Sequence, residues 1–125
     1  MNEILADTSV LIDFFQGKST DEAKRILNAS EVAISILTYL EVCRFCYKTG
    51  KTNLLGVYQQ RLKSFRIFGI STGVCEEAAR TAHSRRLSMA DAVIYATAKE
   101  NGLKLATSDS DFKGMEGIVF LKPKK

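Results

Sequence analysis

Four acidic residues of this sequence stand at positions where they could bind a metal ion. Asp7 directly follows the apolar run Ile4–Ala6, and Asp109 follows the later run Leu103–Thr107. Glu41 belongs to a helical pattern that begins after another apolar run. If these runs are parallel strands, the acids gather at one edge of the sheet. Carboxylate oxygens there suit a hard divalent cation, Mg²⁺ or Mn²⁺.

The fourth acid, Asp91, lies in the apolar helical stretch Ala90–Ala96. No Lys or Arg occurs between Arg86 and Lys99, so a local ion pair is not expected. A carboxylate in such surroundings is unfavourable unless it is paired, protonated or bound to a metal. A bound metal ion is the simplest explanation for a carboxylate at this position. Two divalent ions are the usual device for in-line hydrolysis of a phosphodiester, although the sequence leaves open whether one or two are bound.

Each acid also has a simpler interpretation. Thr38-x-x-Glu41 and Ser88-x-x-Asp91 both have the spacing of a capping box at a helix start. The acids after strands could cap a helix or lie in a polar loop. Caps have no reason to converge, however, and these four acids are all expected on the same side of a sheet.

The elements that would position the acids alternate along the chain. Amphipathic helical patterns separate the apolar runs, and one helix from about Ser88 stops at Asn101-Gly102. The apolar runs predict strands at Ile4–Ala6, Val32–Ile36, Phe65–Ile70, Leu103–Thr107 and Ile118–Leu121. This alternation predicts an α/β fold, a single three-layer α/β/α domain with a mostly parallel sheet.

Length and composition agree with one folded domain spanning residues 1–125, with 46% hydrophobic and 26% charged residues. No apolar stretch approaches the roughly 18 residues that a membrane helix needs. The segment Met1–Asp7 lacks the features of a secretory signal, so a cytoplasmic protein is expected. The last residues, Lys122–Lys125, are expected to form a solvated tail.

Three cysteines cannot complete a disulfide framework, and we expect them to be reduced and buried. They are Cys43, Cys46 and Cys75. With His83, the single histidine, they could just supply four zinc ligands. Structural zinc sites normally use two tight pairs on turns, whereas the first pair here lies in a helical pattern.

The net charge of +4 makes a polyanionic partner plausible. Residues 42–75 contain six Lys and Arg and no acid, and could follow a phosphate backbone, although a solvated helical face is the simpler interpretation. Tyr47 and Tyr58 could stack on unpaired bases or pack in a core or dimer interface. The candidate RNA-binding residues are Arg44, Lys48, Arg85 and Arg86.

Four stretches, taken in order, resemble a PIN domain, and more narrowly the VapC ribonuclease toxins of toxin–antitoxin pairs. Each stretch alone is weakly specific, but the ordered set covers nearly the whole chain. They are Ile4–Ile12, Ser35-x-x-Thr38-x-x-Glu41-Val42, Leu87-x-x-x-Asp91-Ala92-x-Ile94-x-Ala96-Thr97-Ala98 and Ala106-Thr107-Ser108-Asp109-x-Asp111-Phe112.

The resemblance implies a catalytic, metal-binding cluster made of Asp7, Glu41, Asp91 and Asp109. Asp111 would lie behind the ligands or replace one of them. The hydroxyls of Thr8, Ser9 and Thr107 would orient ligands or water. The resemblance further implies a Mg²⁺- or Mn²⁺-dependent ribonuclease, a homodimer, and inhibition by a small VapB-like antitoxin that blocks the acidic pocket.

Three alternatives stay open at this stage. A PIN nuclease of RNA maturation or decay would share the acids but have no antitoxin. A nucleic-acid-binding module without catalysis would use only the basic stretch and leave the surroundings of Asp91 unexplained. A receiver-like signalling module also gathers carboxylates around Mg²⁺, but it needs an early acidic pair and a late Lys after a strand, a set this sequence does not show.

Overall fold

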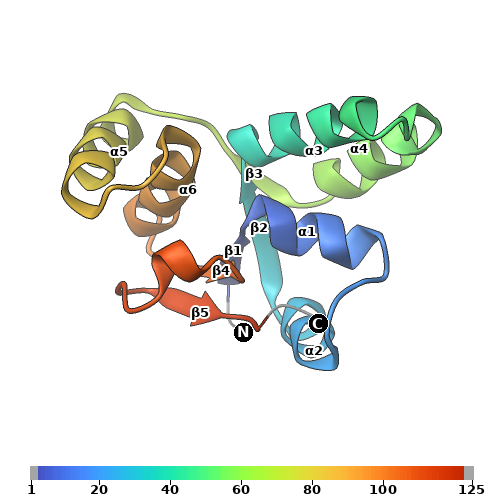
Figure 1. Ribbon diagram of the computed structural model, residues 1–125, viewed down its shortest axis with the longest axis horizontal. Helices are drawn as coiled ribbons and strands as arrows, with labels where there is room; N and C mark the ends of the chain where they lie inside the picture. Colours follow the sequence, from blue (N-terminus) through green and yellow to red (C-terminus); the bar gives the residue numbers. More distant parts are fainter. Residues whose placement is uncertain (1–2, 123–125) are drawn as a thin grey trace.

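A computed structural model describes residues 3–122 and shows five strands in one fully parallel sheet (Figure 1). The strand order is β3-β2-β1-β4-β5. The strands are β1 (Glu3–Ala6), β2 (Glu31–Ser35), β3 (Arg66–Phe68), β4 (Lys104–Thr107) and β5 (Ile118–Phe120). The helices are α1 (Thr8–Phe15), α2 (Asp21–Ala29), α3 (Ile36–Lys48), α4 (Leu55–Lys63), α5 (Thr72–Arg85) and α6 (Met89–Glu100). The predicted three-layer α/β architecture is confirmed.

Side-chain alternation along β1 explains the two helical layers. Ile4 and Ala6 belong to a core packed with residues of α1 to α4, whereas Leu5 belongs to a core packed with α5 and α6. Successive side chains of a strand point to opposite faces, so one apolar run serves both cores. Figure 1 shows α5 and α6 on one side of the sheet and α1 to α4 on the other. Each fully buried Leu or Ile of these cores contributes about 2 kcal/mol.

The order in which strands are added to the sheet reverses at β1. From β1 it goes outward to β2 and β3, and it then returns to the opposite side of β1 to form β4 and β5. The Asp7 amide donates to the Ala106 carbonyl at 2.9 Å, which holds the ends of β1 and β4 together. Such a switch point, at the carboxyl ends of parallel strands, is where open α/β sheets place their ligands.

Side-chain caps begin most of the helices, and polar residues directly before a helix explain where it starts. The caps are Asp7 for α1, Thr20 for α2, Ser35 for α3, Ser71 for α5 and Ser88 for α6. The capping-box interpretation of Thr38-x-x-Glu41 is therefore wrong: the Leu37 amide bonds to Ser35 Oγ, and Thr38 lies buried inside α3. For Ser88-x-x-Asp91 the cap is confirmed, because Ser88 Oγ accepts from the Asp91 amide at 3.1 Å.

Three predicted strands are shorter in the structure, the last of them by Leu121 alone, and the predicted strand Val32–Ile36 is displaced to Glu31–Ser35 because Ile36 begins α3. The run Phe65–Ile70 forms only the edge strand β3, because the Phe65 amide still bonds the Leu62 carbonyl at the end of α4, and Ile70 is exposed. The Leu103 amide likewise donates to the Ala98 carbonyl in the last turn of α6, so β4 begins one residue later than predicted, at Lys104. Lys122 is exposed, as a tail would be, while Pro123–Lys125 lie outside the described residues.

All three cysteines are free, but they differ in burial. Cys46 is buried, and burial raises the pKa of its thiol, while Cys43 is half-buried. The expectation of a buried thiol is wrong for Cys75, which is exposed on α5. Within residues 3–122, no helix has the length and apolar character needed to cross a membrane.

Candidate metal centre

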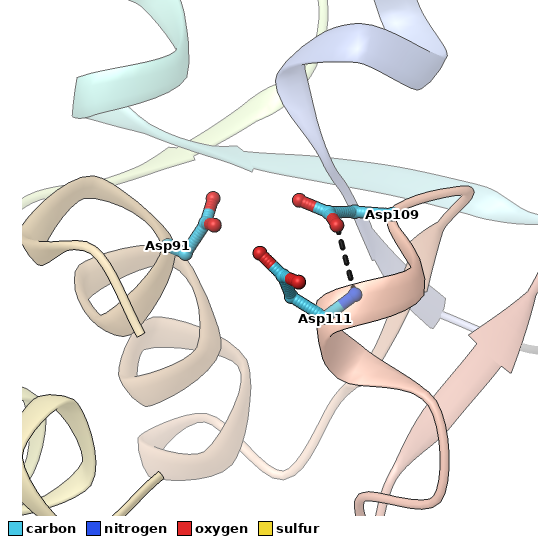
Figure 2. Close-up of side chains that lie close together, drawn as sticks. All are labelled: Asp91, Asp109 and Asp111. Carbon is cyan, nitrogen blue, oxygen red and sulfur yellow. Dashed lines mark hydrogen bonds between the residues drawn. The ribbon is translucent and has the colours of Figure 1, made fainter. Parts of the chain in front are cut away.

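Three carboxylates meet above the ends of the sheet strands (Figure 2). Asp91 projects from the first turn of α6, while Asp109 and Asp111 come from the loop after β4. One oxygen atom of each carboxylate lies within 4.8 Å of those of the other two. Residues separated by about twenty positions in the sequence thus form one cluster of oxygen ligands.

The loop after β4 is fixed by its own contacts rather than by chance packing. Asp109 Oδ1 accepts from the Asp111 amide at 2.9 Å and so caps the short 3₁₀ turn Ser110–Phe112. Phe112 is fully buried and stacks on the Tyr95 ring at a centroid distance of 6.2 Å. The Tyr95 hydroxyl also donates to the Glu116 carbonyl at 3.0 Å. Since Tyr95 lies one turn after Asp91 on α6, these contacts hold the loop acids against α6.

Asp7 lies deeper, at the end of β1, with only 5% of its surface exposed. Its Oδ1 accepts from the Thr8 amide at 2.8 Å, and its Oδ2 accepts from the Thr107 hydroxyl at 2.7 Å. Burial raises the pKa of Asp7, and the two hydrogen bonds oppose that rise. Thr107 Oγ1 also accepts from the Asp109 amide at 3.0 Å, so one hydroxyl joins two of the acids.

Glu41, on α3, is linked to the residue that follows Asp7. Its Oε1 accepts from the Thr8 hydroxyl at 2.7 Å. The negative charges of Asp109 and Glu41 both add to the rise in the pKa of Asp7, so each of the two lies within electrostatic reach of Asp7. Glu41 and Asp7 nevertheless lie outside the set whose oxygens meet within 4.8 Å.

The electrostatics of the cluster are those of acids without a cation from the protein. Burial raises the pKa of Asp91 to about 6, and repulsion from Asp7, Asp109 and Asp111 adds to the effect, while the Ser88 hydroxyl opposes it. The ion pairs found among residues 3–122 join Arg66 to Glu3, Arg80 to Glu77 and Lys99 to Glu77, and none involves the cluster. Several adjacent carboxylates without a positively charged neighbour fit a hard divalent cation, whereas zinc would favour His or Cys ligands.

Of the residues expected at the site, the structure brings Asp91 and Asp109 into direct proximity and places Asp7 within electrostatic reach of both, while Glu41 acts on Asp7 and bonds Thr8. Asp111, expected behind the ligands or in place of one, lies within the cluster itself. Thr8 and Thr107 bond the acids as expected, but Ser9 is exposed and makes no side-chain hydrogen bond in the described part of the chain. The sequence reasoning missed Thr38, whose hydroxyl lies 3.0 Å from that of Thr8.

Three basic side chains of residues 42–75 lie over aromatic rings. Arg61 lies over the Phe15 ring at 4.2 Å, Arg66 over the Phe68 ring at 4.5 Å, and Lys51 over the Phe45 ring at 5.6 Å. The four candidate RNA-binding residues, Arg44, Lys48, Arg85 and Arg86, are all exposed.

The two tyrosines also differ. Tyr58 is 5% exposed and packs on Phe15, so its core interpretation holds, whereas Tyr47 is 65% exposed. Of the two, Tyr47 alone presents a ring on which a base could stack.

A parallel sheet with a carboxylate cluster at its switch point defines the class: an α/β domain with an acidic site fitted to a divalent cation. The chain belongs to the PIN domain family, whose sequence model matches residues 4–118. The resemblance to PIN domains that the sequence motifs indicated is confirmed, and the chain shares its fold with chains of solved VapBC complexes.

Several solved structures are similar to the chain over nearly its whole length. A chain from a toxin-antitoxin complex of Klebsiella pneumoniae is 34% identical, with 93% of this chain and 95% of that chain covered and a TM-score of 0.81. Chains from VapBC2 of Rickettsia felis and VapBC-5 of Mycobacterium tuberculosis share the fold, with TM-scores of 0.78 and 0.70. The Rickettsia felis chain is 14% identical, and the match covers 96% of this chain and 98% of that one. The Mycobacterium tuberculosis chain is 22% identical, and the match covers 98% of this chain and 99% of that one. Among curated proteins, the sequence comparison finds no match.

Proposed function

We propose that this PIN domain is a ribonuclease that depends on Mg²⁺ or Mn²⁺ and acts as the toxin of a toxin–antitoxin pair. The observation that carries the proposal is the cluster of Asp91, Asp109 and Asp111, whose oxygens lie within 4.8 Å and have no cationic partner in the described chain. The toxin assignment is supported by the 34% identical chain of a toxin-antitoxin complex.

The proposed ligands are Asp91 and Asp109, with Asp111 as a further ligand and Asp7 and Glu41 beside them. A bound divalent ion supplies Lewis-acid stabilisation of a phosphodiester and activation of water for its hydrolysis. Asp7 keeps a fixed orientation because Thr8 and Thr107 bond its two oxygens. Thr107 also holds the Asp109 backbone, so the two sides of the site keep their spacing.

RNA is the proposed substrate, and exposed cations beyond the acidic cluster support it. Arg44 and Lys48 lie one turn apart on α3, the helix that carries Glu41, and they are free of the aromatic contacts that engage Arg61 and Arg66. Arg85 ends α5 and lies shortly before the start of α6, the helix that carries Asp91. Phosphate groups are the natural partners of such side chains.

The proposed partners are a second copy of the chain and a small antitoxin protein. An apolar stripe on α3 supports the homodimer: Ile36, Leu40 and Tyr47 are 42%, 61% and 65% exposed and recur at helical spacing. Light scattering coupled to gel filtration should report twice the mass of 13.9 kDa. Leu40→Lys should give the monomer, whereas Val57→Lys, at an exposed apolar position on α4 outside the stripe, should not.

The central experiment is cleavage of a single-stranded RNA by the purified protein. Cleavage with Mn²⁺ or Mg²⁺ that stops with a chelator and is absent in Asp91→Asn supports the proposal. Undiminished cleavage by both Asp91→Asn and Asp7→Asn would overturn the site assignment. Inhibition by the product of an adjacent small reading frame would support the toxin role, and its absence would favour a PIN nuclease of RNA maturation or decay.

A further inference from the structure

Thr38 carries a buried hydroxyl that the core does not require. The residue is 0% exposed within α3, where a valine of nearly the same shape would pack without a polar atom. Across residues 3–122, its side chain has one hydrogen-bond partner, the Thr8 hydroxyl at 3.0 Å. Its hydroxyl does not bond back to its own helix, unlike that of Thr97, which donates to the Val93 carbonyl at 2.7 Å.

The neighbouring bonds fix the direction of this contact. Thr8 Oγ1 lies 2.7 Å from Glu41 Oε1, and an ionised carboxylate can only accept. A hydroxyl has one hydrogen, so Thr8 gives it to Glu41, the charged and stronger acceptor. The Thr38 hydroxyl must then donate to Thr8, which gives the chain Thr38 to Thr8 to Glu41.

From this chain we infer that Thr38 is a positioning residue of the metal centre, which acts through Thr8 to orient the Glu41 carboxylate. The inference rests on the proposed function, since it assigns Thr38 a part in the same site. Without the Thr38 hydroxyl, Thr8 keeps its hydrogen and its bond to Glu41 but loses one of the two bonds that fix its rotamer. The Glu41 carboxylate, which accepts from Thr8, is then held less firmly in place. Partners that lie behind metal ligands typically change metal affinity tenfold or more.

The experiment measures Mn²⁺ binding to the metal-free protein by titration calorimetry, with RNA cleavage recorded in parallel. Thr38→Val should weaken Mn²⁺ binding about tenfold. Thr38→Ser, which keeps the hydroxyl, should restore affinity to within about twofold. Thr97→Val is the matched control, because it removes an equally buried helical hydroxyl outside the site and should leave binding unchanged.

A second variant shows whether the effect passes through Glu41. In a Glu41→Gln background, Thr38→Val should change Mn²⁺ affinity little further, because interacting residues are not additive. Thr38→Ala serves if the valine variant does not fold. Wild-type affinity in Thr38→Val or Thr38→Ala, or an equal loss in Thr38→Val and Thr38→Ser, overturns the inference. If the wild-type protein binds no Mn²⁺, the proposed function itself fails, and the inference fails with it.

Discussion

Two acids on neighbouring helices have opposite electrostatic surroundings. Glu77 on α5 accepts hydrogen bonds from Arg80 at 2.7 Å, from the Thr81 hydroxyl at 3.0 Å and from Lys99 at 3.4 Å. These bonds lower the pKa of Glu77, and the bond from Arg80 has the largest effect. Asp91 on α6 has no cationic partner in the described chain, and burial and other acids raise its pKa to about 6, although the Ser88 hydroxyl opposes the rise. The fold pairs one carboxylate with cations of the protein and provides no such partner for the other among the described residues.

Helical spacing explains the difference. The residues three and four positions after Glu77 are Arg80 and Thr81, which can both donate to a carboxylate. At the same spacing after Asp91 stand Ile94 and Tyr95, of which Ile94 is buried and Tyr95 donates elsewhere. An acid with no cation at this spacing on its own helix is therefore a better candidate for a ligand-binding site than one that is already paired with a cation.

The largest expected effect separates these two acids by activity. Asp91→Asn should lower metal-dependent RNA cleavage by at least about 100-fold, because it removes a proposed ligand. Glu77→Gln should leave cleavage within about twofold, since Glu77 bonds only structural partners. Initial rates on one RNA at saturating Mn²⁺ measure both variants. Equal losses in both would remove the functional distinction between the two sites.

The next effect concerns stability without metal. Because the folded pKa of Asp91 lies near 6 and the usual value is 3.8, folding favours its protonated form. Its contribution to the free energy of unfolding is therefore largest at acid pH and falls as pH rises from 3.8 through about 6. Allowing for partial exposure, we expect a loss of about 1 kcal/mol, measured by urea unfolding at each pH.

Two changes should remove that loss. Asp91→Asn lacks the titrating group, so its stability should depend less on pH over this range. Mn²⁺ should restore stability to the wild-type protein at neutral pH by binding the folded state. The variant Asp21→Asn, at an exposed acid in the first turn of α2, is the control and should keep the wild-type pH dependence. A wild-type protein that gains stability with rising pH in this range would contradict the raised pKa.

Most of the fold follows from local pattern, because each strand lies in a short apolar run and every helix except α4 begins at a side-chain cap. Position within the sheet also followed for Asp7 and Asp109, since an acid directly after a parallel strand must lie at the carboxyl edge. The errors fell at ends of elements. The length of the edge strand β3 was overestimated, because apolar residues such as Phe65 and Ile70 also occur in turns and in the segments that join a strand to a helix.

Two features of the site depend on tertiary contacts that spacing cannot reveal. Asp111 enters the cluster because Phe112 is anchored on Tyr95 and the turn is capped by Asp109. Thr38 looked like a cap because its spacing to Glu41 suited one, but Ser35 begins the helix and leaves Thr38 facing Thr8. A buried hydroxyl at a core position of α3 was the available signal for Thr38.

The comparison of paired and free side chains extends to the cations, with a smaller expected effect. Lys48→Ala should raise the KM for RNA by roughly threefold and reduce the salt dependence of binding by about one ion, if Lys48 contacts a phosphate. Arg66→Ala should change neither, because Arg66 pairs with Glu3 and lies over the Phe68 ring. Fluorescence anisotropy with a labelled RNA at several salt concentrations measures both. The same salt slope in wild type and Lys48→Ala would exclude Lys48 from the interface.

The smallest effect should have the opposite sign of pH dependence from that of Asp91. Because the folded pKa of Glu77 is lowered below 4.5, its stabilisation is present above the unfolded value and is lost as pH falls through the folded value. Glu77→Gln should therefore reduce the free energy of unfolding at neutral pH by about 0.5 kcal/mol and by less in acid. Urea unfolding of this variant beside Asp91→Asn tests the contrast directly. Trends of the same sign in both variants would show that the two carboxylates have similar surroundings after all.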